Sequence, residues 1–242
     1  MILLIDIGNS RTKYILADEI SNEKAKGVNN DCISVEWLDN NFKEIKKIII
    51  ASVSADSILN LIIDWATINL IQFKLIESET KAYGVISSYQ HPKQLGIDRW
   101  LAMIGAATLY SNKNILIIDA GTATTIDLLS AQGQHYGGWI LPGIHLMFDS
   151  LVKHTSKINT PQALIASVAF GDDTNTNVNN ACWAATIGAI NLAIIQASRQ
   201  LTIIDVILLT GGNASSVEKL LEYPTIIEDN LIFYGLERYN LA

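Results

Sequence analysis

The chain has 242 residues, of which 49% are hydrophobic and 17% charged, and its formal net charge is −7 at pH 7. This length allows one large domain or two smaller ones, and we expect two lobes that fold as one unit. No basic tract accompanies the acidic charge, which argues against a nucleic-acid partner because phosphate-backbone contacts need clustered Lys and Arg. No uninterrupted apolar run approaches the roughly 18 residues that span a bilayer, so we expect no membrane partner.

The start of the chain and its cysteines indicate the cytoplasm. The opening residues MILLID have no basic region before them and no small-residue cleavage site after them, so we expect no signal peptide. Cys32 and Cys182 are the only cysteines and form no CxxC motif. A reducing compartment fits this pattern better than a disulfide scaffold does.

Short apolar runs alternate with helical patterns along the chain. The runs predict buried strands at 2–5, 48–51, 115–118 and 206–209. The helical patterns cover 97–111, 179–201 and 215–222, whereas the polar stretches 22–31 and 171–180 are expected to be an exposed connection and a loop. This alternation predicts an α/β fold with an at least partly parallel sheet, and the SNKN segment suggests a boundary between lobes near 112–114.

Two strands run into the same kind of turn, about half a chain apart. The first is IDIGNSRTK, where Gly8 lets the backbone turn sharply and approach a ligand, and where Asn9 and Ser10 offer hydrogen-bond donors. Lys13 would reach back to a phosphate if the turn opened a hairpin. The second is IDAGTATTID, where Gly121 matches Gly8 and Thr122 matches Asn9.

A single Asp-x-Gly turn is most often structural, but its duplication favours a shared function. Two such turns facing each other would hold a polyphosphate from both sides. The segment VILLTGGNA adds Gly211 and Gly212 directly after a strand, where they would allow contact with a base or a sugar. Neither GxxxxGK[ST] nor GxGxxG occurs, so the two commonest nucleotide-binding loops are absent from the sequence.

The ordered motifs DIGNSRTK, GIDRW, DAGTATTID, GGWILPG and TGGNA resemble those of the type III pantothenate kinases. The resemblance runs from Asp6 to Ala214, and it places the chain in the actin-like ATPase and sugar-kinase superfamily. It implies an α/β (ribonuclease H-like) fold of two similar lobes, 1–112 and 113–242, with a nucleotide cleft between them. It also implies ATP-dependent phosphorylation of the pantothenate hydroxyl to 4′-phosphopantothenate, the first step of coenzyme A biosynthesis.

The GIDRW motif carries the predicted catalytic group. On a helix, the apolar residues from Ile97 onward share one face, which directs Asp98 and Arg99 away from that stripe and lets both face a cleft. Asp98 would be the general base, as its counterpart is in the family, and Arg99 would clamp the substrate carboxylate with two hydrogen bonds. Gly96 and Ile97 belong to the same substrate-binding motif. The alternative is an ordinary helix N-terminal Asp favoured by the helix dipole.

Two further substrate contacts follow from the resemblance. Tyr89 matches a substrate-contacting Tyr of the family, with Tyr83 as the nearby competitor. Thr174 best matches a Thr that contacts pantothenate from across a dimer interface, although Thr176 competes for that position. The family also implies a homodimer with the pocket near its interface, partly formed by GGWILPG.

The cofactors implied are ATP, Mg²⁺ and a monovalent cation, either K⁺ or NH₄⁺. In the family the Asp that matches Asp119 helps bind the monovalent cation, and Asp6 is the natural holder of Mg²⁺, through water, because Mg²⁺ retains several waters. The four histidines show no metal-binding spacing and are expected at the surface or at an interface.

Two other functions compete with the pantothenate kinase. One is an ATP-binding regulator without kinase activity, since relatives of the family have been described as accessory factors in transcription. A pure switch, however, needs no base and no carboxylate clamp, so Asp98 and Arg99 favour the enzyme. The other is a sugar kinase, which would need polar residues to read several hydroxyls; the apolar GGWILPG segment argues against it.

Overall fold

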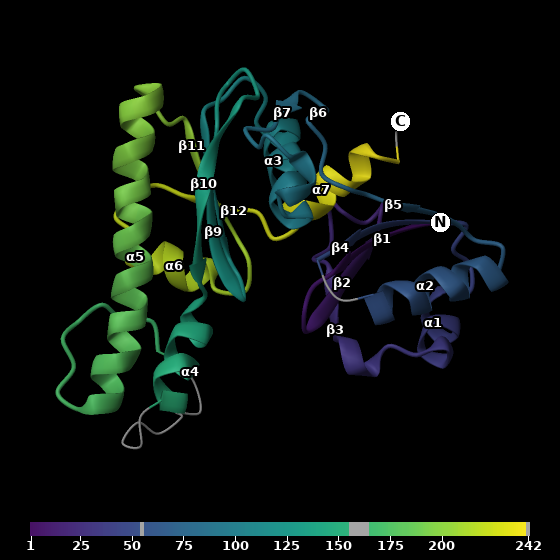
Figure 1. Ribbon diagram of the computed structural model, residues 1–242, viewed down its shortest axis with the longest axis horizontal. Helices are drawn as coiled ribbons and strands as arrows, with labels where there is room; N and C mark the ends of the chain where they lie inside the picture. Colours follow the sequence, from purple (N-terminus) through teal and green to yellow (C-terminus); the bar gives the residue numbers. More distant parts are fainter. Residues whose placement is uncertain (54–55, 155–164, 241–242) are drawn as a thin grey trace. The chain divides into compact units, whose positions relative to one another are not determined.

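The computed structural model describes residues 1–53, 56–154 and 165–240. The chain divides into two compact units (Figure 1). The first contains Met1–Ser111 together with Asp229–Ala242, and the second contains Asn112–Glu228. Each unit is built on its own five-stranded sheet.

The sheet of the first unit has the order β3-β2-β1-β4-β5. Strand β1 pairs antiparallel with β2 and parallel with β4, while β3 and β5 continue the sheet at its two edges. The strands are β1 (Ile2–Ile7), β2 (Arg11–Leu16), β3 (Lys26–Asn29), β4 (Lys47–Ser52) and β5 (Gln72–Leu75).

Helices cover both faces of this first sheet. Alternate residues of β1, beginning with Leu3, are buried in one core with residues of α1 (Val35–Phe42) and α2 (Asp56–Ile68). Helices α3 (Ile97–Leu109) and α7 (Leu231–Arg238) pack against each other and contact β4. The remaining elements are short: η1 (Asn30–Cys32), β6 (Lys81–Ala82), β7 (Val85–Ile86) and η2 (Pro92–Gln94).

The second unit repeats the topology of the first. Its sheet has the order β10-β9-β8-β11-β12, with β8 antiparallel to β9 and parallel to β11, so β8 takes the place that β1 has in the first sheet. The strands are β8 (Ile115–Ala120), β9 (Ala123–Leu129), β10 (His135–Pro142), β11 (Val206–Thr210) and β12 (Ile226–Ile227), and the helices are α4 (Ile144–His154), α5 (Thr174–Leu201) and α6 (Ala214–Leu220).

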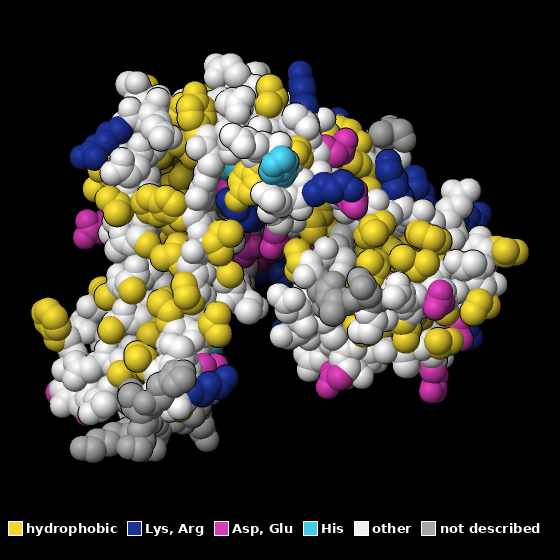
Figure 2. Space-filling view, viewed as in Figure 1, with side chains coloured by type: hydrophobic (Ala, Val, Ile, Leu, Met, Phe, Trp, Pro, Cys, Tyr) yellow, Lys and Arg dark blue, Asp and Glu magenta, His cyan; other side chains and the backbone are white. Residues whose placement is uncertain are grey.

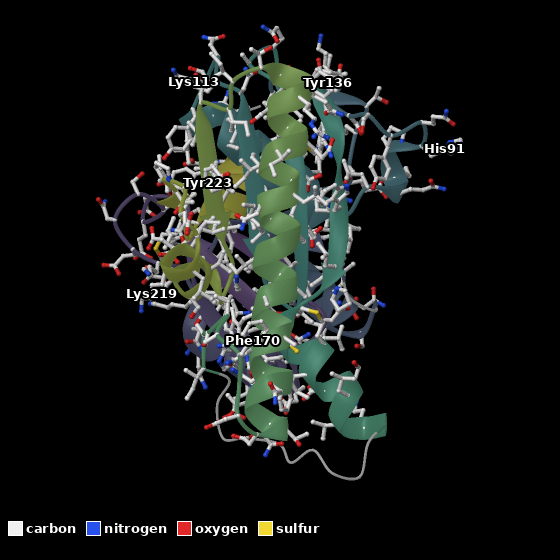
Figure 3. The ribbon with its side chains drawn as sticks, turned by 90° about the vertical axis from the view of Figure 1, so that its left-hand side faces the viewer. His91, Lys113, Tyr136, Phe170, Lys219 and Tyr223 are labelled. Carbon is white, nitrogen blue, oxygen red and sulfur yellow. The ribbon has the colours of Figure 1, made fainter. Side chains whose placement is uncertain are left out.

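Apolar side chains also lie on the outer surface of the second unit. Figure 2 shows them over the region that α5 and β10 occupy in Figure 1, and Figure 3 looks directly onto α5, with Tyr136 beside its upper end. Leu192 and Ile195 are exposed on α5, and Trp139 is exposed on β10. Large apolar side chains of α5 and β10 are therefore exposed on this unit.

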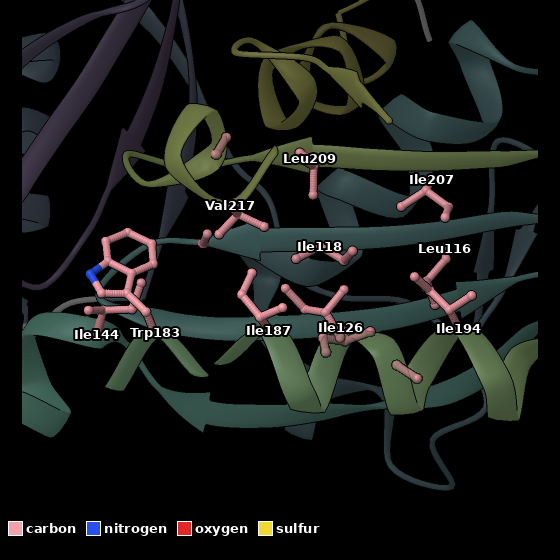
Figure 4. Close-up of a cluster of buried hydrophobic side chains, with 14 of the residues drawn as sticks. Leu116, Ile118, Ile126, Ile144, Trp183, Ile187, Ile194, Ile207, Leu209 and Val217 are labelled. Carbon is pink, nitrogen blue, oxygen red and sulfur yellow. The ribbon is translucent and has the colours of Figure 1, made fainter. Parts of the chain in front are cut away.

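The opposite side of α5 forms the core of the second unit. Trp183, Ile187 and Ile194 point toward Ile118 and Ile126 of the sheet (Figure 4). By length and composition alone, α5 is apolar enough to cross a membrane. Its buried stripe against β8 and β9 accounts for much of that apolar character, as expected for the core helix of an α/β unit.

All the predicted strands and helices are present, and two polar stretches differ from expectation. The stretch 22–31 contains β3, because the backbone of Lys26–Asn29 pairs with the exposed edge of β2. The stretch 171–180 contains the first turns of α5, which begins at Thr174 because Asp173 caps the helix by accepting from the Thr176 backbone. In both stretches, backbone hydrogen bonding rather than the polarity of the side chains determines the secondary structure.

The segment Asp229–Ala242 packs in the first unit, whereas the sequence suggested a second lobe running from 113 to the end of the chain. The reason is the close approach of α7 to α3. A Cβ on Gly105 would collide with the Leu231 carbonyl oxygen, and a Cβ on Gly235 would collide with the Leu101 carbonyl oxygen. The two glycines let the helix backbones touch, so the chain returns to the first unit.

Replacing Gly235 with Ala should destabilise the protein, because the new methyl group meets the backbone of α3. We expect the free energy of unfolding to fall by about 1–3 kcal/mol, measured by urea unfolding. Gly188→Ala is the matched control: Gly188 is exposed on α5, a Cβ there meets nothing within 4 Å, and Ala should stabilise the helix by up to about 1 kcal/mol. Equal effects of the two substitutions would contradict the close packing of α3 on α7.

Candidate functional site

The first Asp-x-Gly turn joins β1 to β2 as a tight hairpin. Gly8 donates its backbone N–H to the Arg11 carbonyl at 3.0 Å, and a Cβ on Gly8 would lie only 2.8 Å from that oxygen. Lys13 is the register partner of Asp6, so the two side chains lie on the same face of the hairpin. The turn therefore does open a hairpin, which was the condition for Lys13 to reach back toward a phosphate.

Asn30 holds this turn in shape, and the sequence pattern did not single it out. Its amide Nδ2 donates to the Gly8 carbonyl at 2.9 Å and to the Asn9 carbonyl at 3.3 Å. Its Oδ1 accepts from the buried Thr12 hydroxyl at 2.8 Å, and its backbone N–H donates to the Ser10 carbonyl at 3.0 Å. Asn30 therefore fixes the backbone of the turn that carries Asn9 and Ser10.

The second turn joins β8 to β9, and Asp119 lies just before it. Asp119 has the same place in β8 that Asp6 has in β1, one residue before the last of the strand. Gly121 donates to the Ala123 carbonyl at 3.0 Å, which makes this turn one residue shorter than the first. The expected equivalence of Gly121 with Gly8 holds in topology, but Ser10 has no counterpart in the shorter turn.

Three glycines surround Asp119 and its turn. Gly211 follows β11 with φ +88°, and a Cβ there would collide with Asp119 Oδ1. A Cβ on Gly121 would lie 3.3 Å from the same oxygen. Gly143 donates to the Thr122 carbonyl at 3.0 Å and lies against the turn from the start of α4. Larger residues at these positions would close the space around the carboxylate, whereas a Cβ on Gly212 would meet no atom within 4 Å.

Asp98 lies at the start of α3, where its carboxylate folds back over Gly96. Its Oδ1 accepts the Arg99 backbone N–H at 2.7 Å, and a Cβ on Gly96 would lie 2.5 Å from that oxygen. Asp98 is half-buried, whereas the side chain of Ile97 is buried. Gly96 therefore leaves room for the carboxylate, and only the backbone of Ile97 is suited to contact a ligand.

Arg99 is buried near the start of α3. Only 4% of the residue is exposed, and its Nη1 donates to the Tyr89 hydroxyl at 2.9 Å. This burial does not conflict with the expectation that Arg99 points away from the apolar stripe and faces a cleft, which stays a prediction. The structure joins two of the predicted substrate contacts, Arg99 and Tyr89, in one hydrogen-bonded pair. Tyr83, the competitor of Tyr89, stacks edge-on against Tyr239 instead.

Two serines hold the segment between 78 and 95 in place. The Ser78 hydroxyl donates to the Leu95 carbonyl at 2.8 Å, directly before the helix cap at Gly96. Ser87 Oγ accepts the Tyr89 backbone N–H at 3.1 Å. Both serines are buried, so Tyr89 and the start of α3 are fixed by the same short stretch of chain.

Thr174 is the first residue of α5 and is exposed in the second unit. Its competitor Thr176 is engaged, since its hydroxyl donates to Asp173 Oδ2 at 2.6 Å and its backbone N–H donates to Asp173 Oδ1. These hydrogen bonds lower the pKa of Asp173, which keeps the cap ionised. Thr174 is thus better suited than Thr176 to contact a ligand.

His135, Cys32 and Cys182 are further side chains of potentially reactive type. His135 is 1% exposed, and its Nε2 lies 2.9 Å from the buried Asp127 Oδ1, which corrects the expectation that it lies at the surface or an interface. A β-bulge between His135 and Gly138 turns the ring inward. Burial raises the pKa of Cys182, so that thiol stays protonated, and Cys32 is exposed and free.

No group of three or more His, Cys, Asp or Glu that could hold a metal ion occurs among the described residues. A cation that relied on one carboxylate, water and phosphate oxygens would not need such a group. Asp6 is 8% exposed beside the first turn, and a Cβ on Gly211 or Gly121 would crowd the carboxylate of Asp119. The donor sets therefore fit hard cations held together with a phosphorylated ligand.

Comparison with known proteins decides the family. The family model described as type III pantothenate kinase matches residues 2–196. The chain belongs to the type III pantothenate kinase family. A type III pantothenate kinase of Colwellia psychrerythraea is 45% identical over 251 residues, covering 99% of this chain and all of the relative, and one of Pseudoalteromonas translucida is 36% identical, covering 98% and 94%. The chain is therefore a kinase.

Solved structures support the same fold. A protein of Campylobacter jejuni named as a candidate Baf family transcriptional activator aligns with a TM-score of 0.61 and 26% identity, covering 98% of this chain and 96% of that one. A candidate 2-dehydro-3-deoxygalactonokinase of Sinorhizobium meliloti aligns with a TM-score of 0.53 at 12% identity, covering 98% and 97%. The latter likeness concerns the fold alone and agrees with the predicted actin-like ATPase and sugar-kinase superfamily.

Replacing Asn30 with Ala should loosen the first turn, because it removes the partners of two carbonyls and leaves the buried Thr12 hydroxyl without its acceptor. We expect the free energy of unfolding to fall by about 1–3 kcal/mol in urea unfolding. Asn41→Ala is the control: its side chain is exposed and donates only to the Trp37 carbonyl of its own helix, so the change should stay within about 0.5 kcal/mol. Similar losses in both variants would contradict the role of Asn30.

Proposed function

We propose that the protein transfers the γ-phosphoryl group of ATP to the hydroxyl of pantothenate, giving 4′-phosphopantothenate and ADP. The observation that carries this proposal is the hydrogen-bonded group at the start of α3, where Asp98, Arg99 and Tyr89 lie together within a family of pantothenate kinases. Phosphoryl transfer needs positioning, charge neutralisation and an acceptor for the hydroxyl proton. The chain offers groups suited to each task.

Asp98 would act as the general base. In the transfer, the substrate oxygen forms a bond to the γ-phosphorus, the bond to the bridging oxygen of ADP breaks, and the hydroxyl proton passes to the Asp98 carboxylate. The second oxygen of that carboxylate is suited to this task, since Oδ1 already accepts the Arg99 backbone N–H. This single hydrogen bond would also limit the rotation of the carboxylate.

Arg99 and Tyr89 would bind the substrate together. The guanidinium carries a fixed positive charge, and its fork of donors matches a carboxylate, which pantothenate has at the end opposite its reacting hydroxyl. Tyr89 holds Nη1 at 2.9 Å, so the guanidinium is oriented before the substrate arrives. Preorganisation of this kind lowers the entropy lost on binding.

The two Asp-x-Gly turns would hold the phosphates of ATP. Gly8, Asn9, Ser10 and Lys13 would act in the first unit, and Gly121 and Thr122 in the second. Backbone N–H groups in such turns bind anions without a positive surface, which suits a protein of net charge −7. Gly211 and Gly212 would allow the nucleoside part of ATP to approach the backbone after β11.

Two carboxylates would hold the cations. Asp6 would hold Mg²⁺ through water, and Asp119 would hold a monovalent cation, K⁺ or NH₄⁺. When bound, these cations offset the charge of the phosphates. The glycines around Asp119 support its role, because they leave the carboxylate accessible.

An ATP-dependent regulator is the second candidate, favoured by the likeness to the protein of Campylobacter jejuni named as a transcriptional activator. A regulator has no need to keep a carboxylate, a guanidinium and a phenol at one helix start. The Colwellia psychrerythraea relative named as a pantothenate kinase is 45% identical to this chain, whereas the Campylobacter jejuni protein is 26% identical. We therefore favour the enzyme.

Asp98→Asn should leave ATP binding nearly intact while lowering kcat at least about a hundredfold, the usual scale for a lost general acid–base group. Asn keeps an oxygen able to accept the Arg99 backbone N–H, so the helix start should persist. ADP release with saturating pantothenate gives kcat, and calorimetric titration gives ATP affinity. A kcat near that of the unmodified protein would remove Asp98 from the reaction.

Arg99→Lys should raise the KM for pantothenate more than it lowers kcat, because Lys keeps the charge but loses the fork of donors. Initial rates over a range of pantothenate concentrations measure both constants. Tyr89→Phe is the companion variant, which removes one hydrogen bond of the guanidinium and should raise the same KM less. An unchanged KM in Arg99→Lys would contradict the carboxylate clamp.

We propose that two copies associate in the cytoplasm through the apolar face of the second unit formed by α5 and β10. A groove of about 280 Å³ runs there between Trp139 and Leu192. Leu192 is 48% exposed and Ile195 is 45% exposed, which leaves apolar area that a second copy would cover. In such a dimer Thr174 would contact pantothenate bound to the neighbouring subunit.

Ile195→Glu should convert the protein to a monomer, because it buries a charge in the proposed interface. Size-exclusion chromatography with light scattering measures the mass, and the KM for pantothenate should rise as Thr174 is lost from the neighbouring site. Ile68→Glu is the matched control, since Ile68 is 80% exposed at the end of α2 in the first unit. A dimer that survives Ile195→Glu, or full pantothenate affinity in the monomer, would contradict this arrangement.

A further inference from the structure

A chain of hydrogen bonds links the end of α7 to the first turn of α3. Trp100 is fully buried, and its indole Nε1 donates to the Tyr239 hydroxyl at 2.9 Å. That hydroxyl in turn donates to Glu79 Oε1 at 2.7 Å. Tyr239 is 5% exposed, so both hydrogen bonds are largely shielded from water.

Tyr239 is itself held firmly. Lys74 donates to its backbone carbonyl at 3.5 Å and lies 5.4 Å from the centre of its ring. The ring of Tyr83 packs edge-on against it, with centroids 4.8 Å apart. Burial, and then the hydrogen bond to Glu79, raise the pKa of Tyr239, so the hydroxyl stays protonated and keeps its role as donor to that carboxylate.

Trp100 belongs to the same helical turn as the proposed base and clamp. Its backbone N–H makes the first hydrogen bond of α3, to the Gly96 carbonyl at 3.0 Å. Successive Cα–Cβ bonds of a helix point about 100° apart, so holding the backbone of one turn in place sets the directions in which its side chains leave the helix. Anchoring the indole of Trp100 therefore helps to hold the turn of α3 from which Asp98 and Arg99 project.

The segment that contains Glu79 reaches the site by a second route. Its neighbour Ser78 donates to the Leu95 carbonyl, and Thr80 accepts the Ser87 backbone N–H at 2.9 Å. Ser87 in turn accepts from Tyr89. The hydroxyl of Tyr239 thus contacts Trp100 at the start of α3 and also Glu79. Glu79 belongs to the segment that holds Tyr89, the hydrogen-bond partner of Arg99.

We propose that Tyr239 is a positioning residue for the reaction: by holding the Trp100 indole, it fixes the direction in which the first turn of α3 presents its polar side chains. Because Asp98 and Arg99 carry the chemistry proposed above, this role of Tyr239 rests on that proposed function.

Tyr239→Phe tests the role, since it keeps the ring and removes only the hydroxyl. We expect kcat to fall about tenfold, as small misplacements of reacting groups do, while the KM for ATP stays at the value of the unmodified protein. Hydrogen exchange of the Trp100 indole N–H, followed by NMR of ¹⁵N-Trp-labelled protein, should become faster. This signal reports the released indole directly.

Tyr234→Phe is the matched control on the same helix. Its hydroxyl donates to the Ile20 carbonyl at 3.4 Å, away from α3, so kcat and the indole exchange should stay unchanged. Unchanged kcat in Tyr239→Phe, equal losses in both variants, or a loss without faster indole exchange would each overturn the positioning role. Lack of any activity toward pantothenate in the unmodified protein would overturn the proposed function and this role together.

Discussion

The close approach of α3 and α7 at Gly105 and Gly235 is the constraint on which the proposed catalytic group depends. Because neither glycine has a side chain, the two helix backbones come into contact, and the last helix of the chain packs in the first unit. That contact brings Tyr239 beside Trp100, in the turn that also carries Asp98. A bulky residue at either glycine would separate the helices and release this turn.

The phosphate-binding part of the account depends on a different constraint, the repeated topology of the two sheets. In each unit the central strand ends in Asp-x-Gly and pairs antiparallel with the next strand, so Asp6 and Asp119 occupy equivalent places. The copies have diverged in detail. The first turn is longer and is held by Asn30, while the second is surrounded by glycines that keep Asp119 accessible.

Much of this arrangement could be predicted from sequence, because strongly apolar strands and duplicated turns are local signals. The four most apolar strands, the Asp-x-Gly turns and the helix that begins with GIDRW follow from such patterns. What the patterns missed depends on contacts between residues of different elements or loops, which local patterns do not report. Asn30 reaches back to Gly8, His135 pairs with Asp127 after a β-bulge, and α7 returns to α3 through two glycines. The hydrogen bond between Arg99 and Tyr89 was not predicted either, since Tyr89 lies outside the helix.

The most direct test of the central claim is ADP release by the purified protein with ATP and Mg²⁺, measured with and without pantothenate in potassium and then in sodium buffer. The account predicts release that depends on pantothenate and is faster in potassium, because Asp119 would then hold its cation. Protein that binds ATP but releases no ADP on addition of pantothenate would contradict the kinase and favour the regulator. Equal rates in the two buffers would contradict the cation role of Asp119 alone.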